Sequence, residues 1–260
     1  MLISTFNVNS IRSRLHIVIP WLEEKRPDIL CMQETKVTND LFPQKNFEDI
    51  GYQVTFSGQK AYNGVAVASP HPIVNVIFGF EDGEDSKEDL ARLIRCRIMG
   101  IDLVNTYVPQ GRAVDHPNFK YKLRWLSRLM ALFNGAYSPA LDIIWCGDLN
   151  VAIEPIDVYA PETKEGHVCY HRDVREGLKD LMDWGFEDIF RRFHPEKNQY
   201  TFYDYRIPNA VKRRLGWRID YIMATSGMGK KASGSYIDME PRLKEKPSDH
   251  TFLQAEFRLD

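Results

Sequence analysis

Polar side chains that can bind metals and move protons recur directly after short apolar runs of this sequence. The segments that share this pattern are Phe6-Asn7-Val8-Asn9, Gln33-Glu34-Thr35-Lys36, Asn105-Thr106-Tyr107-Val108-Pro109, Gly147-Asp148-Leu149-Asn150 and Ser248-Asp249-His250. Carboxylates and amides at the ends of buried strands are costly unless a ligand or hydrogen bonds satisfy them. The donors are oxygens and an imidazole, without cysteine, and this set suits Mg²⁺ or Mn²⁺ better than Zn²⁺.

Each segment alone also has an ordinary structural interpretation. The alternatives are a turn residue for Asn7, a surface acid for Glu34, a core edge for Tyr107, a loop start for Asp148 and a hydrogen-bonded core histidine for His250. Jointly, polar motifs at several strand ends predict one titratable cleft. A divalent metal, a carboxylate base and an imidazolium supply what phosphodiester cleavage needs, namely an in-line nucleophile, stabilised phosphoryl oxygens and a neutralised leaving oxygen.

Short apolar runs, several of them rich in β-branched residues, must position these groups. The predicted strands are Leu2–Phe6, Ile29–Met32, Val65–Ala68, Leu93–Ile98, Ile101–Thr106, Ile143–Cys146, Tyr221–Ala224 and Phe252–Phe257. They alternate with helical segments, and no linker rich in Gly, Ser or Pro divides them. The pattern favours a layered α/β sandwich in which residues 1–260 form a single domain.

Helical spacing is clearest in two segments. Steps of three and four place one set of side chains on a single helix face: Phe119, Leu123, Leu126, Met130 and Phe133. Val174, Leu178 and Leu181 form a second face, with Gly185 as the expected C-terminal cap. Residues 11–24 are also helix-like, and we expect Pro20 to kink that helix or to begin a new turn.

Two of the predicted strands share a pattern of acids. Asp28 and Asp142 each precede an apolar strand, and a carboxylate follows six residues later, at Glu34 and at Asp148. This offset indicates a duplicated arrangement that delivers two acids at equivalent strand ends. Chance similarity between two buried strands is the alternative.

The composition is that of an ordinary globular protein. Hydrophobic residues make up 43% and charged residues 27%, which argues against disordered and fibrous classes. No apolar stretch approaches the about 18 residues of a membrane span, and the N-terminal residues lack the features of a signal peptide. We therefore expect an intracellular, cytoplasmic and nucleoid-associated protein. The four cysteines are widely separated and indicate neither a disulfide framework nor a zinc site.

The net charge of −2 is unusual for a protein that binds nucleic acid. Residues 81–89 carry a local charge of −5, which leaves +3 for the rest of the chain. We interpret this acidic run as a solvated loop. Basic residues gather near Arg12, in residues 120–128, and in residues 212–214 with Arg218.

Taken in order, the motifs resemble those of one known family over nearly the whole chain. They are TFNVNSIRSR, LCMQETK, NGVAVAS, NTYVPQG, WCGDLNVA, YTFYDYR, GWRIDYIMAT and EKPSDH. The chain resembles the exonuclease III family of class II abasic-site endonucleases, within the DNase I-like endonuclease/exonuclease/phosphatase superfamily. This resemblance implies a four-layer α/β sandwich, in which two packed mixed sheets are flanked by helices.

The resemblance also implies a role for each strand-end residue. Glu34 would be the principal metal ligand, with Asn7 and Asp249 near the metal and Mg²⁺, or Mn²⁺ as a substitute, as the ion. Asp148 would deprotonate the attacking water. The remaining candidates for catalysis or metal binding are Tyr107 at the leaving oxygen, Asn150 beside Asp148, and His250, held by Asp220 against the phosphoryl oxygen. Asn9 stands where one branch of the family has aspartate, so a direct ligand role there is in doubt.

Substrate recognition is expected from a small apolar pocket and from surface cations. Phe202, Trp217 and Ile219 match the family's abasic-sugar pocket, with buried core residues as the alternative interpretation. The candidate phosphate contacts, each of which could also be a solvated charge, are Arg12, Arg112, Lys212 and Arg218.

The sequence therefore predicts a monomeric DNA repair enzyme that acts on duplex DNA with abasic sites or 3′-blocked ends. It would cut the backbone 5′ to the abasic site and leave a 3′-hydroxyl, and the resemblance also implies 3′→5′ exonuclease and 3′-phosphatase or 3′-phosphodiesterase activity in open proportion. The alternatives are a superfamily phosphatase acting on small phosphoesters and a catalytically idle DNA-binding module. The intact Glu34, Asp148, Asn150 and His250 argue against an idle module.

Overall fold

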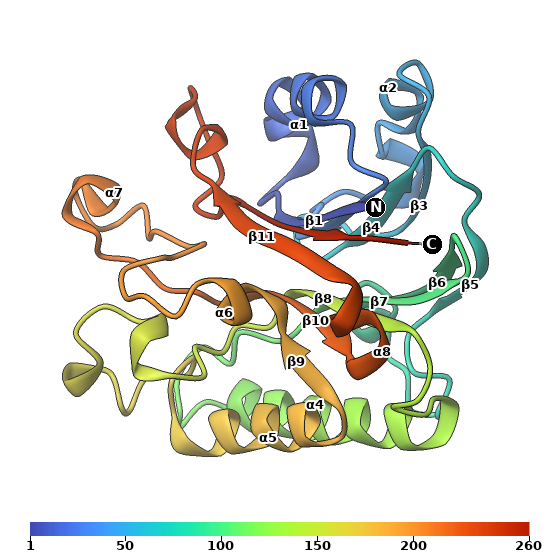
Figure 1. Ribbon diagram of the computed structural model, residues 1–260. Coiled ribbons are helices and arrows are strands. Elements are labelled where there is room, and N and C mark those ends of the chain that lie inside the picture. Colours follow the sequence, from blue (N-terminus) through green and yellow to red (C-terminus); the bar gives the residue numbers. More distant parts are fainter. Residues whose placement is uncertain (260) are drawn as a thin grey trace.

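The apolar runs of the sequence assemble into two six-stranded mixed sheets, which pack face to face between outer helices (Figure 1). The computed structural model describes residues 1–259. The first sheet has the order β11 (Ala232–Asp238), β12 (Phe252–Phe257), β1 (Leu2–Asn7), β2 (Ile29–Gln33), β4 (Val65–Ser69) and β3 (Gln53–Ser57). The second has the order β5 (Val74–Phe78), β6 (Leu93–Ile98), β7 (Ile101–Tyr107), β8 (Ile143–Asp148), β10 (Asp220–Thr225) and β9 (Phe186–Asp188).

Helices cover the outer face of each sheet (Figure 1). Over the first sheet lie α1 (Ile11–Lys25) and α2 (Gln44–Glu48), and over the second lie α4 (Pro117–Ala136) and α5 (Arg172–Asp183). The short helices are α3 (Lys87–Leu90), α6 (Ile189–Phe193), α7 (Ala210–Arg213) and α8 (Ser226–Lys231). Among the helices of residues 1–259, none is long and apolar enough to cross a membrane.

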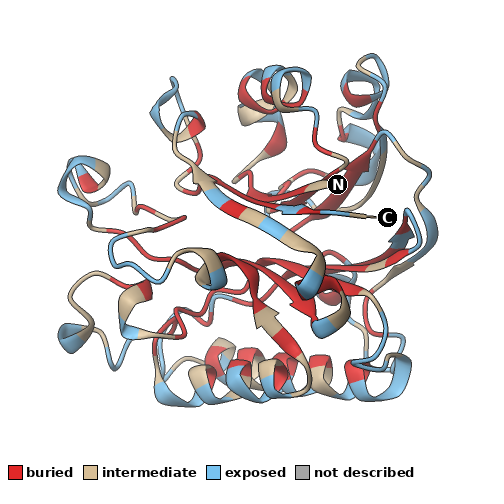
Figure 2. Cartoon of the chain, viewed as in Figure 1, coloured by how far each residue is buried: buried red, intermediate tan, exposed pale blue. Residues whose placement is uncertain are grey.

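Successive side chains of a strand point to opposite faces of its sheet, and both faces of the central strands are buried, so these strands are apolar on both faces. In β2, Ile29 and Cys31 enter the core between the two sheets, while Leu30 and Met32 pack toward α1. A third core joins the second sheet to α4 and α5. Figure 2 shows this burial as red bands along both sheets and on the inner faces of the helices. A strand that is buried on both faces therefore has a continuous apolar sequence, without polar residues at alternate positions.

The duplicated acid pattern corresponds to a duplicated topology. β1 and β2 form a parallel pair joined through α1, and β7 and β8 form a parallel pair joined through α4. The other strand pairs of the described chain are antiparallel. Glu34 directly follows β2 and Asp148 ends β8, so each sheet delivers one acid from the second strand of its parallel pair.

The predicted helices are present, with two differences in detail. In α4 the buried face is centred on Lys122, Trp125 and Leu129, whereas Leu123 and Met130 are only partly buried. Helix α1 continues through Pro20 to Lys25, so no separate helix begins there. Gly185 follows α5 with a φ of 145°, and its N–H bonds to Met182, as expected of a C-terminal cap.

Most of the acidic run at residues 81–89 is exposed, as expected of a solvated loop, but part of it is bound to α4. Arg128 of α4 pairs with Asp82, Asp85 and Asp89 at 2.7–3.1 Å, and Asp89 is buried. Arg124 pairs with Glu84. The acidic run and α4 therefore compensate part of each other's charge, and Arg128 is held by three acids.

Candidate active site

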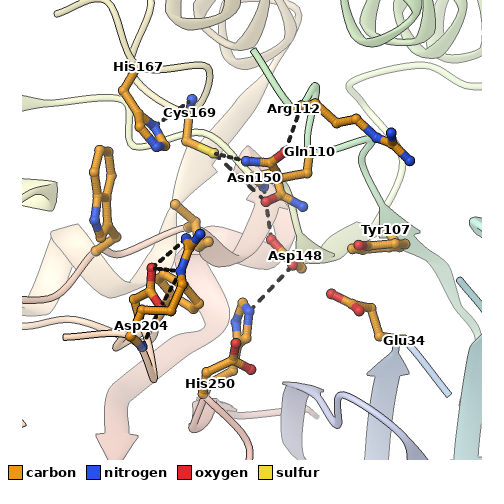
Figure 3. Close-up of a pocket in the computed structure, with 15 residues that line it drawn as sticks. Glu34, Tyr107, Gln110, Arg112, Asp148, Asn150, His167, Cys169, Asp204 and His250 are labelled. Carbon is orange, nitrogen blue, oxygen red and sulfur yellow. Dashed lines mark hydrogen bonds and ion pairs between the residues drawn. The ribbon is translucent and has the colours of Figure 1, made fainter. Parts of the chain in front are cut away.

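The strand ends that carry the polar motifs meet at one edge of the sandwich, around a cavity of about 540 Å³ (Figure 3). The lining residues come from both sheets and from the loops between them. They are Glu34, Tyr107, Gln110, Arg112, Asp148, Asn150, His167, Cys169, Phe202, Asp204, Arg206, Trp217, Ile219, Asp249 and His250.

Asn7 joins the acids of the two sheets. Its buried side-chain amide donates hydrogen bonds to Glu34 Oε1 and to Asp148 Oδ2, both at 2.8 Å. The loop before β12 holds Asn7 in turn, because Ser248 Oγ donates to the Asn7 carbonyl at 2.7 Å. A single residue thus fixes the separation of the two carboxylates on which the predicted chemistry depends.

Glu34 sits in a left-handed backbone conformation, with a φ of 52°. Lys36 Nζ lies 2.6 Å from Glu34 Oε2. Burial opposes ionisation of Glu34, but attraction to Lys36 and hydrogen bonds from Lys36 and Asn7 together lower its pKa below the ordinary value. Glu34 is therefore an ionised carboxylate at neutral pH.

Asp148 is held firmly but is costly to ionise. Asn150 N donates to Oδ1 at 2.9 Å. Burial, with repulsion from Asp220 and Glu34, raises the pKa of Asp148 to about 7, although His250 and Asn7 favour its charged form. The preceding Gly147 has a φ of 135°, and a Cβ there would meet the Thr106 carbonyl oxygen at 1.9 Å, so this turn requires glycine.

His250 lies between two acids that face each other across β8 and β10. Asp148 and Asp220 are directly opposed in the strand register. His250 Nδ1 is 2.8 Å from Asp220 Oδ2, and Nε2 is 3.7 Å from Asp148 Oδ2. Burial lowers the pKa of His250, but the attraction of Asp220 and Asp148 outweighs it and raises the pKa to about 10. The ring is an imidazolium directed into the cavity.

Tyr107, at the end of β7, is a buried phenol. The Arg92 guanidinium lies 4.7 Å from the centre of its ring. Burial and the negative charge of Glu34 raise the pKa of Tyr107 well above its ordinary value. The hydroxyl therefore stays protonated and can donate a hydrogen bond.

One wall of the cavity is apolar and is built by two paired segments. Phe202 and Trp217 exchange backbone hydrogen bonds at 2.8 and 2.9 Å, and Ile219 follows on the same segment. The Phe202 ring is 4.9 Å from the His250 ring, and the His167 ring is 4.6 Å from Trp217. The apolar wall therefore lies directly beside the charged groups.

Residues 4–250 match the model of the Endonuclease/Exonuclease/phosphatase family. The chain belongs to this family. A solved AP endonuclease from Archaeoglobus fulgidus is 51% identical, with a TM-score of 0.96 over 100% of both chains. NExo from Neisseria, solved as a 3′-5′ exonuclease and as a 3′ phosphatase bound to a product DNA hairpin, is 35% identical, with a TM-score of 0.94 over 100% of both chains.

The curated relatives agree with these structures. Exodeoxyribonuclease III of Haemophilus influenzae is 28% identical over 98% of both chains. The predicted resemblance to exonuclease III and AP endonucleases and the predicted four-layer sandwich are confirmed. The relatives are nucleases, in agreement with the enzyme class predicted for this family member.

The prediction that Arg218 contacts a DNA phosphate was wrong. Its side chain is fully buried and pairs with Asp157 at 2.7 Å and with Asp188 at 2.6 Å, so it cannot reach a DNA backbone. The residues around Trp217 do not reveal whether the arginine that follows is buried or exposed. Arg112 lines the cavity, while Arg12 and Lys212 are exposed and lie outside the lining residues.

Several lining residues were missed by sequence reasoning. They are Gln110, His167, Cys169, Asp204 and Arg206. Three of them lie inside the motifs NTYVPQG and YTFYDYR, namely Gln110, Asp204 and Arg206. Their position in these motifs was the signal that could have identified them. His167 and Cys169 come from the loop before α5 and follow no predicted strand, which leaves no comparable signal.

The donor set of this family member fits a divalent cation. Ligand atoms of Asp148, Asp220 and His250 lie within 4.8 Å of one another, and the buried Asp220 Oδ1 has no hydrogen-bond partner among the described residues. His250 occupies only Oδ2 of Asp220, so Asp220 Oδ1 remains available to an ion, together with the carboxylates of Glu34, Asp148 and Asp249 that line the cavity. Asn7 presents its N–H group to both carboxylates, so its amide would have to turn to ligate a metal. A cation would relieve the repulsion that raises the pKa of Asp148.

Proposed function

We propose that the protein is a Mg²⁺-dependent DNA repair nuclease that hydrolyses the backbone 5′ to abasic sites and leaves a 3′-hydroxyl. The main observation behind the proposal is that Asp148 and His250 lie close together in the cavity, beside the apolar wall formed by Phe202 and Trp217. The same cavity combines a base, a cation and an apolar surface. The likeness to an AP endonuclease over the full chain supports this choice of substrate.

Asp148 is the residue proposed to accept the proton of the attacking water. Its pKa of about 7 is high for an aspartate, and a base with such a pKa still ionises near neutral pH. The hydrogen bonds from Asn7 and Asn150 leave it little freedom to rotate. Asn150 supports Asp148 through its backbone N–H and lines the cavity with its side chain.

His250 and Tyr107 are proposed to stabilise the reacting phosphate. The His250 imidazolium, oriented by Asp220, offers a charged donor to a phosphoryl oxygen, and a fixed donor needs no reorganisation when charge develops. The protonated Tyr107 hydroxyl donates to the phosphate or to the leaving oxygen. Both roles depend on the protonated form that the cavity favours.

Mg²⁺ is proposed to be held mainly by Glu34, with Asp249 and Asp148 nearby and with Asn7, Asn150 and His250 at the margin of the site. Carboxylate oxygens are the ligands this ion prefers. When bound, it would neutralise charge on the phosphate and on the leaving oxygen. Mn²⁺ would be a substitute.

An abasic nucleotide offers no base, so a shallow apolar pocket can select it against a normal nucleotide. Phe202, Trp217 and Ile219 are proposed to contact the extruded sugar. Exposed Arg12, Arg112 and Lys212 are the proposed phosphate contacts on duplex DNA. The protein is proposed to act as a monomeric single domain in the compartment that holds the chromosome.

A second activity at the same site, removal of 3′-phosphates or 3′ nucleotides, is favoured by the likeness to NExo. The same in-line chemistry serves either activity. The loops around Gln110 and Arg206, which line the cavity, are proposed to set the balance between the two activities.

One experiment tests these proposals together. Four labelled duplexes, with an abasic site, a recessed 3′ end, a 3′-phosphate and a uracil, are incubated with Mg²⁺, Mn²⁺, Ca²⁺ or EDTA. We expect incision 5′ to the abasic site with Mg²⁺ and none with EDTA. Binding without incision under every metal would instead favour an idle DNA-binding module. A small phosphoester is assayed in parallel under the same metals, and its rapid hydrolysis with no DNA cleavage would favour a phosphatase.

A further inference from the structure

The most unusual buried charge outside the chemistry described above belongs to Lys122 of α4. Its side chain is fully buried on the inner face of the helix, among the apolar side chains that pack α4 onto the second sheet. A lysine is rarely placed so deeply without a partner. Its amine donates hydrogen bonds to three carbonyl oxygens, those of Gln110 at 3.2 Å, Asn150 at 2.7 Å and Val168 at 2.9 Å.

Three carbonyl acceptors around one nitrogen favour an ammonium group over a neutral amine, against burial, which lowers the pKa of Lys122 below its ordinary value. A neutral amine has two N–H donors and a lone pair, and the lone pair would face one of the three carbonyls. An ammonium has three donors, and here all three are used. The three bonds offset part of the cost of burying the charge.

Each of the three carbonyls belongs to a segment that lines the cavity. Gln110 lines it after β7, and Asn150 lines it after β8. Val168 stands between His167 and Cys169, which both line it. These segments are far apart in the chain, and they meet at one nitrogen atom.

The loop at Gly111 packs against this lysine in a backbone conformation that favours glycine. Gly111 has a φ of 99°, and a Cβ there would lie 3.4 Å from Lys122 Cδ and 3.6 Å from Val168 Cβ. The contact with Asn150 extends further, because Asn150 N donates to Asp148 Oδ1 at 2.9 Å. A short chain of bonds therefore connects Lys122 to the proposed base.

We infer that Lys122 is a positioning residue whose buried ammonium group fixes three segments of the cavity wall and, through Asn150, the orientation of Asp148. Its side chain is not among those that line the cavity. The inference rests on the proposed function for its catalytic consequence, but the tethering of the three segments is independent of it. Loss of the ammonium group leaves three buried carbonyls without their donor and lets the wall relax.

The test compares Lys122→Met with Leu129→Ala. Leu129 is also fully buried and lies two turns further along the same face of α4, but it makes none of these bonds. Thermal unfolding measures the loss of stability in both variants. Hydrogen exchange measures protection of the amides in residues 110–112, 150–152 and 167–170. Incision of abasic DNA gives kcat and KM separately.

We expect Lys122→Met to lose protection in all three segments and to reduce kcat by about 10- to 100-fold, since small misplacements of reacting groups are costly. Leu129→Ala should lower the unfolding temperature and leave both readouts close to wild type at a temperature where it is folded. If Lys122→Met does not fold, Lys122→Gln retains two donors without the charge and is expected to lose the same protection in part.

Unchanged protection in the three segments would overturn the tethering. A loss of kcat no greater than in Leu129→Ala would overturn the link to Asp148. If wild-type protein cuts no abasic DNA, the proposed function fails, whereas the exchange result still decides the tethering.

Discussion

The Nδ1 atom of His250 lies 2.8 Å from Oδ2 of the fully buried Asp220. This contact, together with the charge of Asp148, keeps the ring protonated at a pH where a free histidine is neutral, because it raises the pKa to about 10. The charge of the cavity therefore depends on a residue that does not itself line it.

Asp220→Asn should lower the pKa of His250 toward its ordinary value of 6.5. In the wild type, the stability from this pair is fully present below pH 6.5 and is lost as pH rises toward about 10. The variant should lose that stability at lower pH. NMR titration of the ring and unfolding temperatures between pH 6 and 10, both on metal-free protein, measure it. A ring still charged at pH 9 in the variant would contradict the role of Asp220.

Asp148→Ala should reduce abasic-site incision by about 10³-fold or more, with DNA affinity retained within about tenfold, because a general base acts only in the transition state. Single-turnover cleavage and a binding titration in Ca²⁺ separate the two effects. Equal losses of binding and cleavage would be incompatible with the role proposed for Asp148.

Asp148→Asn tests the cost of the buried charge in the absence of metal. The raised pKa of Asp148 means that its favourable contribution is present below about pH 4 and is lost as pH rises through about 7. The variant should therefore gain stability relative to wild type over that window. Unfolding temperatures of both proteins with EDTA, between pH 4 and 8, measure it. A pH-independent difference would argue against a strained Asp148.

Arg218→Met should destabilise the protein by about 3–5 kcal/mol, because Asp157 and Asp188 keep their buried charges without the arginine. The free energy of unfolding by denaturant measures this loss. Exposed Arg172→Met, which breaks only a surface pair with Glu176, should cost less than about 1 kcal/mol. Similar losses in both variants would mean that the Arg218 network is not a structural centre.

Most of the site could be predicted because its residues follow strands. Each parallel strand pair ends in a polar motif that follows an apolar run and is therefore visible in the sequence. These ends carry Asn7 and Glu34 in the first sheet, and Tyr107 and Asp148 in the second. The central strands were also found, since burial on both faces leaves a continuous apolar sequence.

The edge strands were harder to predict. Val74 and Val76 in β5 are exposed, and β11 contains Ser233, Gly234 and Ser235, so neither strand shows the apolar pattern of a buried one. The burial of charged side chains could not be predicted from the sequence either. Lys122 and Arg218 stand in basic runs, and only the tertiary structure separates them from their exposed neighbours.

The hydrogen bonds of Asn7 to Glu34 and Asp148 span 27 and 141 positions of the chain, and Ser248 holds Asn7 from 241 positions away. During synthesis, the segment with Asp249 and His250 emerges long after the first two acids. A growing chain that lacks residues 248–250 has neither the imidazolium nor the clasp on Asn7. The site can therefore be completed only after the last strand has docked, even though its two acids lie much earlier in the chain.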